Sequence, residues 1–569
     1  MSFGPARRVS SQTTDRGGKA VKFDLLSAAF LNPVGSSARR SVIFALLLFI
    51  AASLLWVFTL AAAEDNSPEK LYLADRSLSP VFNGFAMAGE QITVISLLAV
   101  CGSISLFGYD AFTYAVDSLV ALGILVLFAQ KIRNSGQYTL AGLFSLRAPG
   151  PKPRIAATAV TLAIAIPVLM VQLRTAGIST ALLIGTTSDE AEVLCTVLVG
   201  CLVACFATVA GLRGTSFMHV AKVVITFATL SVLALLTLRR FEWSPAKVVA
   251  AAVKQSTSPG NYLSPGLWRY SGTFGPLNSF GTHIVLVLGT AMMPHIILRV
   301  SASRNGRTAR RSMSIATGLV GIFVLLLIVT GFSAAAVVGG ANIGGLDVSG
   351  QSALIQLASS LLRADSMGQI VLITAMAAVV FFVILTAVTS VTFAAAVSLA
   401  HDLFASGSRR RGDSAELRVL RLTAAVVCVV GLSLAAATHR YPAEFLTTFS
   451  LSVAASCICP ALVYSFFWAK FNGRGLLWSV YGGLLLCVVL QVSSSTVSGS
   501  SFALWPGAHF NWYPFQTPGI VSVPAAFFLG WLGSASGREG SEVDFRSFER
   551  KLLTGVETSP QAADASRLE

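Results

Sequence analysis

Long apolar runs recur along the chain and are separated by short polar breaks. A helix that crosses a bilayer needs about 20 mostly apolar residues, because the hydrocarbon core is about 30 Å thick. Membrane strands are shorter and alternate in polarity, so continuous apolar runs predict helices. We expect about thirteen membrane-spanning helices, at residues 41–62, 82–107, 111–128, 155–185, 192–210, 218–238, 274–298, 312–337, 368–398, 417–437, 443–468, 475–495 and 517–535.

The apolar runs divide the chain into three parts. Residues 1–40 are polar and basic, and they lack the apolar stretch that directly follows the positive charges of a secretory signal. Residues 41–535 form the transmembrane domain, and residues 536–569 form a polar C-terminal tail that we expect to be disordered. The pattern predicts an all-α polytopic protein of the plasma membrane.

Composition and charge support this interpretation. Of the 569 residues, 54% are apolar and 12% are charged, whereas a soluble domain has about 25% charged residues. The net charge is +15, and its Lys and Arg residues lie in breaks between apolar runs. This placement marks the cytoplasmic face of a membrane protein, so we expect the lipid bilayer as a partner and no nucleic acid.

The basic breaks also bear on orientation. Lys and Arg residues cluster after the third, seventh, ninth and eleventh expected spans, which places these breaks inside the cell. An odd number of spans then puts the N-terminus outside, whereas the basic N-terminal tail favours the inside. The side of the N-terminus therefore stays open.

Motifs for covalent chemistry and ATP hydrolysis are absent from the sequence. It contains no Walker A loop, no His-Glu-x-x-His helix and no Gly-x-Ser-x-Gly elbow. The eight cysteines lie inside apolar runs, and we interpret them as small core residues. We expect a protein that is not an enzyme and that needs no cofactor other than a coupling ion.

Two charged residues within the expected spans are functional candidates, because a charge in the bilayer is costly. Glu90 lies in GFAMAGEQITVISLLAVCG (84–102), and Arg174 lies two residues after Gln172 in LMVQLRTAGIST (169–180). Three interpretations compete. The two charges form a buried pair, Arg174 binds a substrate carboxylate through its planar fork, or either residue faces a watery vestibule.

Other polar positions mark possible breaks and ligands. The second span contains Gly89, Thr93 and Ser96, an interruption that is typical of discontinuous helices opening carbonyls toward an ion. In the seventh span, Pro294 and His295 predict either a gate or a simple proline bend. The ninth span carries hydroxyls that either ligate a cation or bond to carbonyls one turn back, namely Thr386, Thr389, Ser390, Thr392 and Ser398.

Several ordered stretches of the chain resemble the sodium/solute symporter family, and within it the acetate permease (monocarboxylate) branch. The matching stretches are LYLADRSLSPVFNGFAMAGE (71–90), SLFGYDAFTYAV (105–116), IRNSGQYTLAGLFSLR (132–147), MMPHIILR (292–299), AVSLAHDLFA (396–405), ELRVLRLTAAVV (416–427), LSVAASCICPALVYSFFW (451–468) and TPGIVSVPAAFFLGWL (517–532). The resemblance implies a LeuT-like core of two inverted five-helix repeats over about residues 82–468, with the first, twelfth and thirteenth spans accessory.

The resemblance also implies where ligands bind. Substrate and ion would meet near the midplane, where the first helix of each repeat is broken. The family's cation ligands fall near the carbonyls of Gly89 and Ile92 and around Thr386 and Ala387, with Thr389 and Ser390 nearby. Only Thr386 supplies a hydroxyl where other symporters place a pair, so both Na+ and H+ stay open as the coupling ion.

Candidate substrate or gating residues are Glu90, Thr93, Ser96, Gln172, Arg174, Pro294 and His295. Glu90 stands where acetate permeases carry Asp, and Arg174 stands where that branch is apolar. We expect secondary active, cation-coupled symport of acetate or another short monocarboxylate into the cell. The alternatives are symport of another small solute, such as pyruvate, propionate or an amino acid, and a transporter-like sensor without flux.

Overall fold

The computed structural model describes residues 34, 36–62, 68–186, 188–209, 211–268, 274–405, 413–439, 441, 444–500, 503–536 and 545–555. Among these residues the regular structure is helical, apart from isolated bridges in the loop that follows residue 492. The prediction of an all-α polytopic protein is confirmed. Most of the expected N-terminal tail, residues 1–40, lies outside the described residues.

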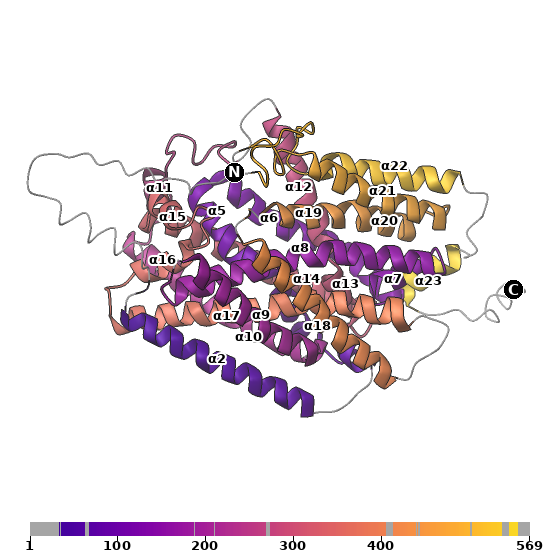
Figure 1. Ribbon diagram of the computed structural model, residues 1–569, viewed down its shortest axis with the longest axis horizontal. Helices are drawn as coiled ribbons and strands as arrows, with labels where there is room; N and C mark the ends of the chain where they lie inside the picture. Colours follow the sequence, from indigo (N-terminus) through magenta and orange to yellow (C-terminus); the bar gives the residue numbers. More distant parts are fainter. Residues whose placement is uncertain are drawn as a thin grey trace, which may run out of the picture.

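The first half of the chain contains the first six spans, which begin with the indigo helix in Figure 1. Each expected range coincides with a helix or a broken helix, and the first span begins at Ser36 rather than near residue 41. The elements are α2 (Ser36–Ala62), α3 (Pro68–Leu73), η1 (Ala74–Arg76), α4 (Pro80–Gln91), η2 (Ile95–Ala99), α5 (Val100–Phe107), α6 (Tyr109–Asn134), α7 (Leu140–Ser145), α8 (Pro151–Leu183), α9 (Asp189–Val209), α10 (Leu212–Arg240) and α11 (Pro245–Gln255).

The second half contains seven further spans. Among the described residues, eleven helices are long and apolar enough to cross a membrane, twelve with the bent pair α4–α5, and the 17-residue α22 is a shorter apolar helix. The elements are α12 (Gly275–Ala291), α13 (Pro294–Ser301), α14 (Gly306–Val337), α15 (Gly340–Leu346), α16 (Ala353–Ser360), α17 (Met367–Val397), η3 (Ser398–Ala405), α18 (Asp413–Ala437), α19 (Glu444–Val453), η4 (Ala454–Ile458), α20 (Cys459–Phe467), α21 (Gly473–Val492), α22 (Gly519–Ala535) and α23 (Phe545–Thr554).

Two of the spans are broken near their middle. The span of α4, η2 and α5 bends by 65° at Ile92 and Thr93. The other breaks at Met292 and Met293, where Pro294 starts α13 and cannot donate the backbone hydrogen bond that would continue α12. Because these spans lie five apart along the chain, they cross the membrane in opposite directions and begin two inverted sets of five.

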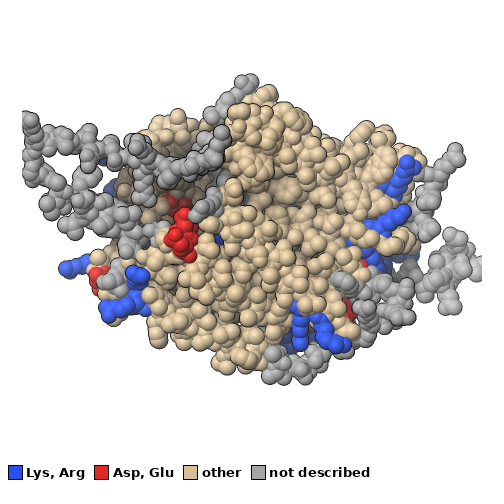
Figure 2. Space-filling model, in the orientation of Figure 1, with Lys and Arg blue, Asp and Glu red and all other residues tan. Residues whose placement is uncertain are grey.

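The burial of the spans separates core from periphery. The spans of α8, of α17 and of α19–α20 are the most buried, and α2 is the least buried. In Figure 1, α8 and α17 run through the molecule, whereas α2 lies along one edge and α21 and α22 lie along the opposite edge. Figure 2 shows Lys and Arg toward the two ends of this view, with an uncharged band between them that fits a bilayer.

The C-terminal segment differs from the expected disordered tail. Within residues 536–569 the structure contains the helix α23, whose Phe548 and Leu552 are buried. The amide of Asn134, at the end of α6, donates a hydrogen bond of 2.9 Å to the carbonyl of Leu552, and the Arg147 guanidinium lies over the Phe548 ring. For residues 545–554 the expectation of disorder is wrong, because the tail is polar on average, while the apolar residues of this segment share one helical face.

Candidate functional site

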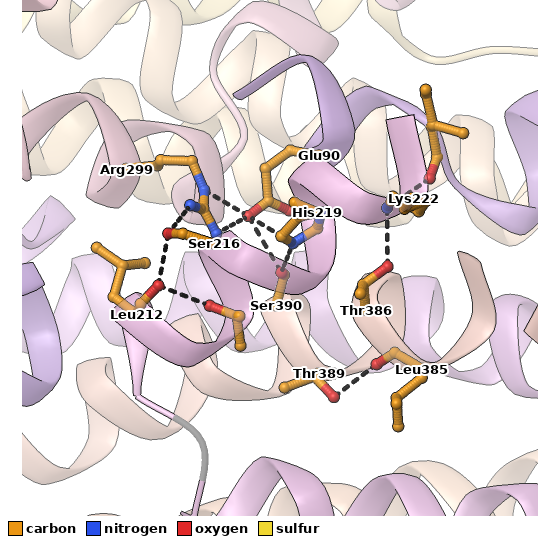
Figure 3. Close-up of polar contacts among 12 residues, drawn as sticks. Glu90, Leu212, Ser216, His219, Lys222, Arg299, Leu385, Thr386, Thr389 and Ser390 are labelled. Carbon is orange, nitrogen blue, oxygen red and sulfur yellow. Dashed lines mark hydrogen bonds and ion pairs between the residues drawn. The ribbon is translucent and has the colours of Figure 1, made fainter. Parts of the chain in front are cut away.

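The buried carboxylate of Glu90 is paired with an arginine from the other broken helix. Nε and Nη2 of Arg299 both lie 2.7 Å from Oε1 of Glu90 (Figure 3). The two residues are 4% and 1% exposed, and their ion pair joins the last turn of α4 to α13. A buried charge is stable only when it is paired and hydrogen-bonded, and Glu90 meets both conditions.

Arg299 replaces Arg174 as the partner that one of our interpretations assigned to Glu90. Arg299 directly follows the expected span 274–298, so the sequence pattern assigns it to a cytoplasmic basic break, but the break at Met292 leads into α13, where Arg299 is buried. Arg174 lies elsewhere on α8, where its two Nη atoms each donate a 2.7 Å hydrogen bond to the carbonyls of Tyr441 and His439. Arg174 thus secures the turn after α18.

Helix α10 supplies a second layer around Glu90. His219 Nε2 lies 3.3 Å from Glu90 Oε1 and 3.0 Å from the hydroxyl of Ser390. Ser390 in turn donates to Glu90 Oε1 at 3.1 Å, and Arg299 Nη1 donates to Ser216 at 2.7 Å. These contacts connect α4, α10, α13 and α17 through one carboxylate.

The expected cation ligands of α4 and α17 lie together, with an unexpected lysine between them. Lys222 Nζ donates to the carbonyl of Ile92 at 2.9 Å and to the hydroxyl of Thr386 at 2.8 Å (Figure 3). Lys222 is fully buried, and Ala387 beside Thr386 is 3% exposed. The sequence could have revealed Lys222, because it is a charge inside the expected span 218–238.

The neighbouring hydroxyls of α17 and of the α4 break have different roles. The Thr389 hydroxyl donates to the carbonyl of Leu385 at 2.6 Å, one turn back along its own helix. Thr93 and Ser96 cap the second half of the broken helix, because each side-chain oxygen accepts from the other residue's amide, at 3.1 and 2.8 Å. The caps therefore give the amides of Thr93 and Ser96 hydrogen-bond acceptors at the break, where the regular helical hydrogen bonds are interrupted.

Gly89 permits the close approach of α4 to α10. A Cβ at this position would lie 2.8 Å from the Cβ of His219, closer than real Cβ contacts come. The lack of a side chain at Gly89 therefore allows the imidazole of His219 to reach Glu90.

A small cleft lies beside the second break. Pro294 and His295 line it, together with Thr161 of α8. The Thr161 hydroxyl is buried and finds no hydrogen-bond partner within the described part of the chain. The imidazole of His295 likewise makes no hydrogen bond to any residue that the structure describes. The other lining residues are apolar, namely Ile164, Ala165, Val168, Met293, Val391 and Ala394.

Gln172 is one of the candidate substrate or gating residues. The structure buries it on α8, at 3% exposed, and its Oε1 has no hydrogen-bond partner among the described residues. It does not line the cleft beside Pro294. Thr161, which does, was missed because a single threonine in an apolar run resembles a helix-packing residue.

Comparisons with known proteins agree with this architecture. Residues 71–483 match the sequence profile of the sodium:solute symporter family. The chain is 30% identical over 524 residues to a monocarboxylic acid transporter of Corynebacterium glutamicum, which covers 89% of this chain and 94% of that relative. It is 32% identical over 521 residues to YwcA, an uncharacterized symporter of Bacillus subtilis, with 90% and 98% covered.

Two solved structures share the fold. A Na+-coupled sialic acid symporter, in a substrate-bound outward-open state, superposes with a TM-score of 0.70 at 11% identity and covers 89% of this chain and 99% of its own. Mhp1, a nucleobase-cation-symport-1 family transporter, gives a TM-score of 0.51 at 15% identity, with 86% and 99% covered. The expected inverted five-plus-five, LeuT-like fold is confirmed. The chain is a multi-pass transporter of the plasma membrane, a cation-coupled symporter that belongs to the sodium:solute symporter family.

Proposed function

We propose that the protein imports acetate or another short monocarboxylate by cation-coupled symport, and that the solute binds in the cleft between Thr161 and His295. The observation that carries this proposal is the buried Thr161 hydroxyl, which has no hydrogen-bond partner among the described residues and lies in a cleft that His295 also lines between apolar walls. A buried hydroxyl without a partner is unfavourable, so a ligand that accepts its hydrogen bond is favoured there.

The chemistry of the cleft selects a carboxylate with a short apolar tail. The hydroxyl of Thr161 and a ring N–H of His295 are donors that a carboxylate can accept. Val168, Val391 and their apolar neighbours match a methyl or ethyl group. An amino acid would need a counter-charge for its ammonium, and no lining residue among those described is a carboxylate. This composition favours a monocarboxylate over an amino acid.

The size and place of the cleft favour a small solute. The cleft has a volume of about 10 Å³, so in this conformation it has room for no more than one water molecule. Acetate therefore enters only when the walls separate, as alternating access requires. The α13 amide groups after Pro294 add the positive end of a half-helix dipole at the same place. The relative from Corynebacterium glutamicum, which is named as a monocarboxylic acid transporter, supports the same substrate class.

The test is uptake into proteoliposomes that contain the purified full-length chain. Labelled acetate, propionate and pyruvate are offered with imposed sodium or proton gradients, and protein-free liposomes correct for diffusion of the undissociated acids. We expect gradient-driven uptake of at least one of these acids and competition from the others. Thr161→Val should raise KM, whereas Thr237→Val, whose buried hydroxyl bonds to the carbonyl of Leu233 at 2.9 Å, should not.

A wild-type protein that is correctly inserted and moves none of these acids under either gradient would refute the proposal. Equal KM values for Thr161→Val and the wild type would refute the assignment of the cleft while leaving the substrate class intact. Saturable binding of a monocarboxylate without flux would favour a sensor.

A further inference from the structure

The ammonium of Lys222 lies between two groups that the family resemblance implies as cation ligands. It contacts the carbonyl of Ile92 at the break of α4 and the hydroxyl of Thr386 on α17, at 2.9 and 2.8 Å. A carbonyl and a hydroxyl are oxygen ligands that suit a hard cation. Here the same two oxygens accept hydrogen bonds from a cation that belongs to the chain.

We propose that Lys222 is itself the coupling cation, so that the protein is a proton symporter and needs no sodium. This inference rests on the proposed monocarboxylate transport, whose solute supplies the matching negative charge. Among the described residues Lys222 makes no ion pair, although it is fully buried. An ammonium in such a place is costly unless an anion arrives nearby.

The charged groups that act on Lys222 leave its ammonium without a carboxylate of its own. Glu90 on α4 and Arg299 on α13 act on Lys222 electrostatically, and His219 faces it from one turn earlier on α10. Glu90 and Arg299 also act electrostatically on His295, at the start of α13. Helix α17 contributes hydroxyls there, such as Thr386. Because Glu90 is already paired with Arg299, the protonated form of Lys222 has no carboxylate of its own until a monocarboxylate binds.

The transport cycle balances in protons and charge. On the outer side the neutral amine of Lys222 takes a proton from hydronium and releases a water molecule, and the resulting ammonium favours entry of the carboxylate anion. On the inner side the anion leaves and the ammonium returns its proton to water. One proton and one carboxylate cross together, so the step carries no net charge across the membrane.

Protonation also controls a contact between moving parts. Hydrogen bonds from an ammonium are about twice as strong as those from a neutral group. The protonated lysine therefore holds the break of α4 against α17 more firmly than the neutral amine does. Release of the proton weakens this bridge at the moment when the solute departs, which favours return of the empty carrier.

The experiment compares accumulation and exchange in proteoliposomes that contain the full-length chain, with choline replacing sodium. Pyruvate is the probe, because less of it crosses a bilayer as the undissociated acid. An inward gradient of one pH unit is about 1.4 kcal/mol and so sustains about tenfold accumulation by the wild type. A potassium diffusion potential set with valinomycin should leave the initial rate unchanged.

Two variants distinguish the need for a positive charge at position 222 from the need for a side chain that can release its proton. Lys222→Arg keeps a permanent cation, so it should retain pyruvate exchange at equal pH but lose the tenfold accumulation. Lys222→Gln should lose accumulation and show exchange with a raised KM. Thr237→Val, on α10 like Lys222 and with its hydroxyl bonded to the carbonyl of Leu233 at 2.9 Å, is the matched control and should accumulate pyruvate as the wild type does.

Accumulation by either lysine variant at the wild-type level would overturn the inference, as would wild-type accumulation that requires a sodium gradient. A second measurement is the binding of radioactive sodium to the purified wild type in lipid nanodiscs. It depends neither on transport nor on the folding of any variant. We expect no saturable binding, and saturable binding that Thr386→Val abolishes would place sodium at this site. Absence of all exchange by the wild type would instead refute the proposed function, and the sodium measurement would still decide which cation fills the site.

Discussion

Removing the charge of Glu90 tests the ion pair that joins the two broken helices. In Glu90→Gln, the guanidinium of Arg299 keeps its contact with Ser216 but loses the carboxylate that two of its nitrogens meet at 2.7 Å. Because Arg299 is 1% exposed, water cannot replace the lost partner. Breaking a buried pair on one side costs about 3–5 kcal/mol. We expect Glu90→Gln to lower the free energy of unfolding by an amount in this range.

A double-mutant cycle shows how much of this loss belongs to the pair. Arg299→Gln alone leaves Glu90 with His219 and Ser390, and it should also be destabilising. The double variant Glu90→Gln/Arg299→Gln removes both charges. It should therefore be more stable than the sum of the single changes predicts, by about 2 kcal/mol, within the usual range for residues in contact.

Equilibrium unfolding in mixed micelles, titrated with SDS and followed by tryptophan fluorescence, measures each free energy. The control is Glu242→Gln, whose carboxylate contacts Lys247 at an exposed position and should change stability little. A Glu90→Gln variant as stable as the wild type, or single effects that add without coupling, would show that the pair does not hold α4 to α13.

Three further outcomes follow from the packing. Gly89→Ala should lower thermal stability and transport together, because its methyl group would lie 2.8 Å from the Cβ of His219, and overpacking costs about 1–3 kcal/mol; unchanged melting and uptake would contradict this. Arg174→Lys should keep the wild-type KM but melt earlier, because a lysine cannot form both hydrogen bonds to the turn after α18, and a large rise in KM would instead indicate substrate recognition. Phe548→Ala should release α23 to limited proteolysis at its flanks without loss of uptake, and an unchanged cleavage pattern would show that its docking depends on other contacts.

The positions of the spans could be predicted from the sequence because the bilayer imposes a local requirement. A run of about 20 apolar residues is visible without knowledge of its neighbours. The break near Ile92 was also visible, since Gly89, Thr93 and Ser96 interrupt an apolar run. These features depend on residues that are close together in the chain.

The partners inside the site could not be predicted in the same way. Glu90 and Arg299 are 209 positions apart, and the sequence pattern indicated Arg174, a charge inside an expected span, as the partner of Glu90. Only the turn of α13 at Pro294 brings Arg299 inward. Lys222 was visible as a charge within an expected span, but its contact with Thr386, 164 positions away, follows from the packing of α10 against α17. Long-range pairing of this kind depends on the complete fold.

The covalent attachment of Lys222 to α10 has a consequence for the surroundings in which the protein works. A dissolved ion fills its site only when its concentration exceeds its dissociation constant, whereas a tethered group has an effective concentration set by the chain. The nitrogen that bridges Ile92 and Thr386 is therefore not lost by dialysis, dilution or a change of salt. The same contact is available in fresh water and in brine.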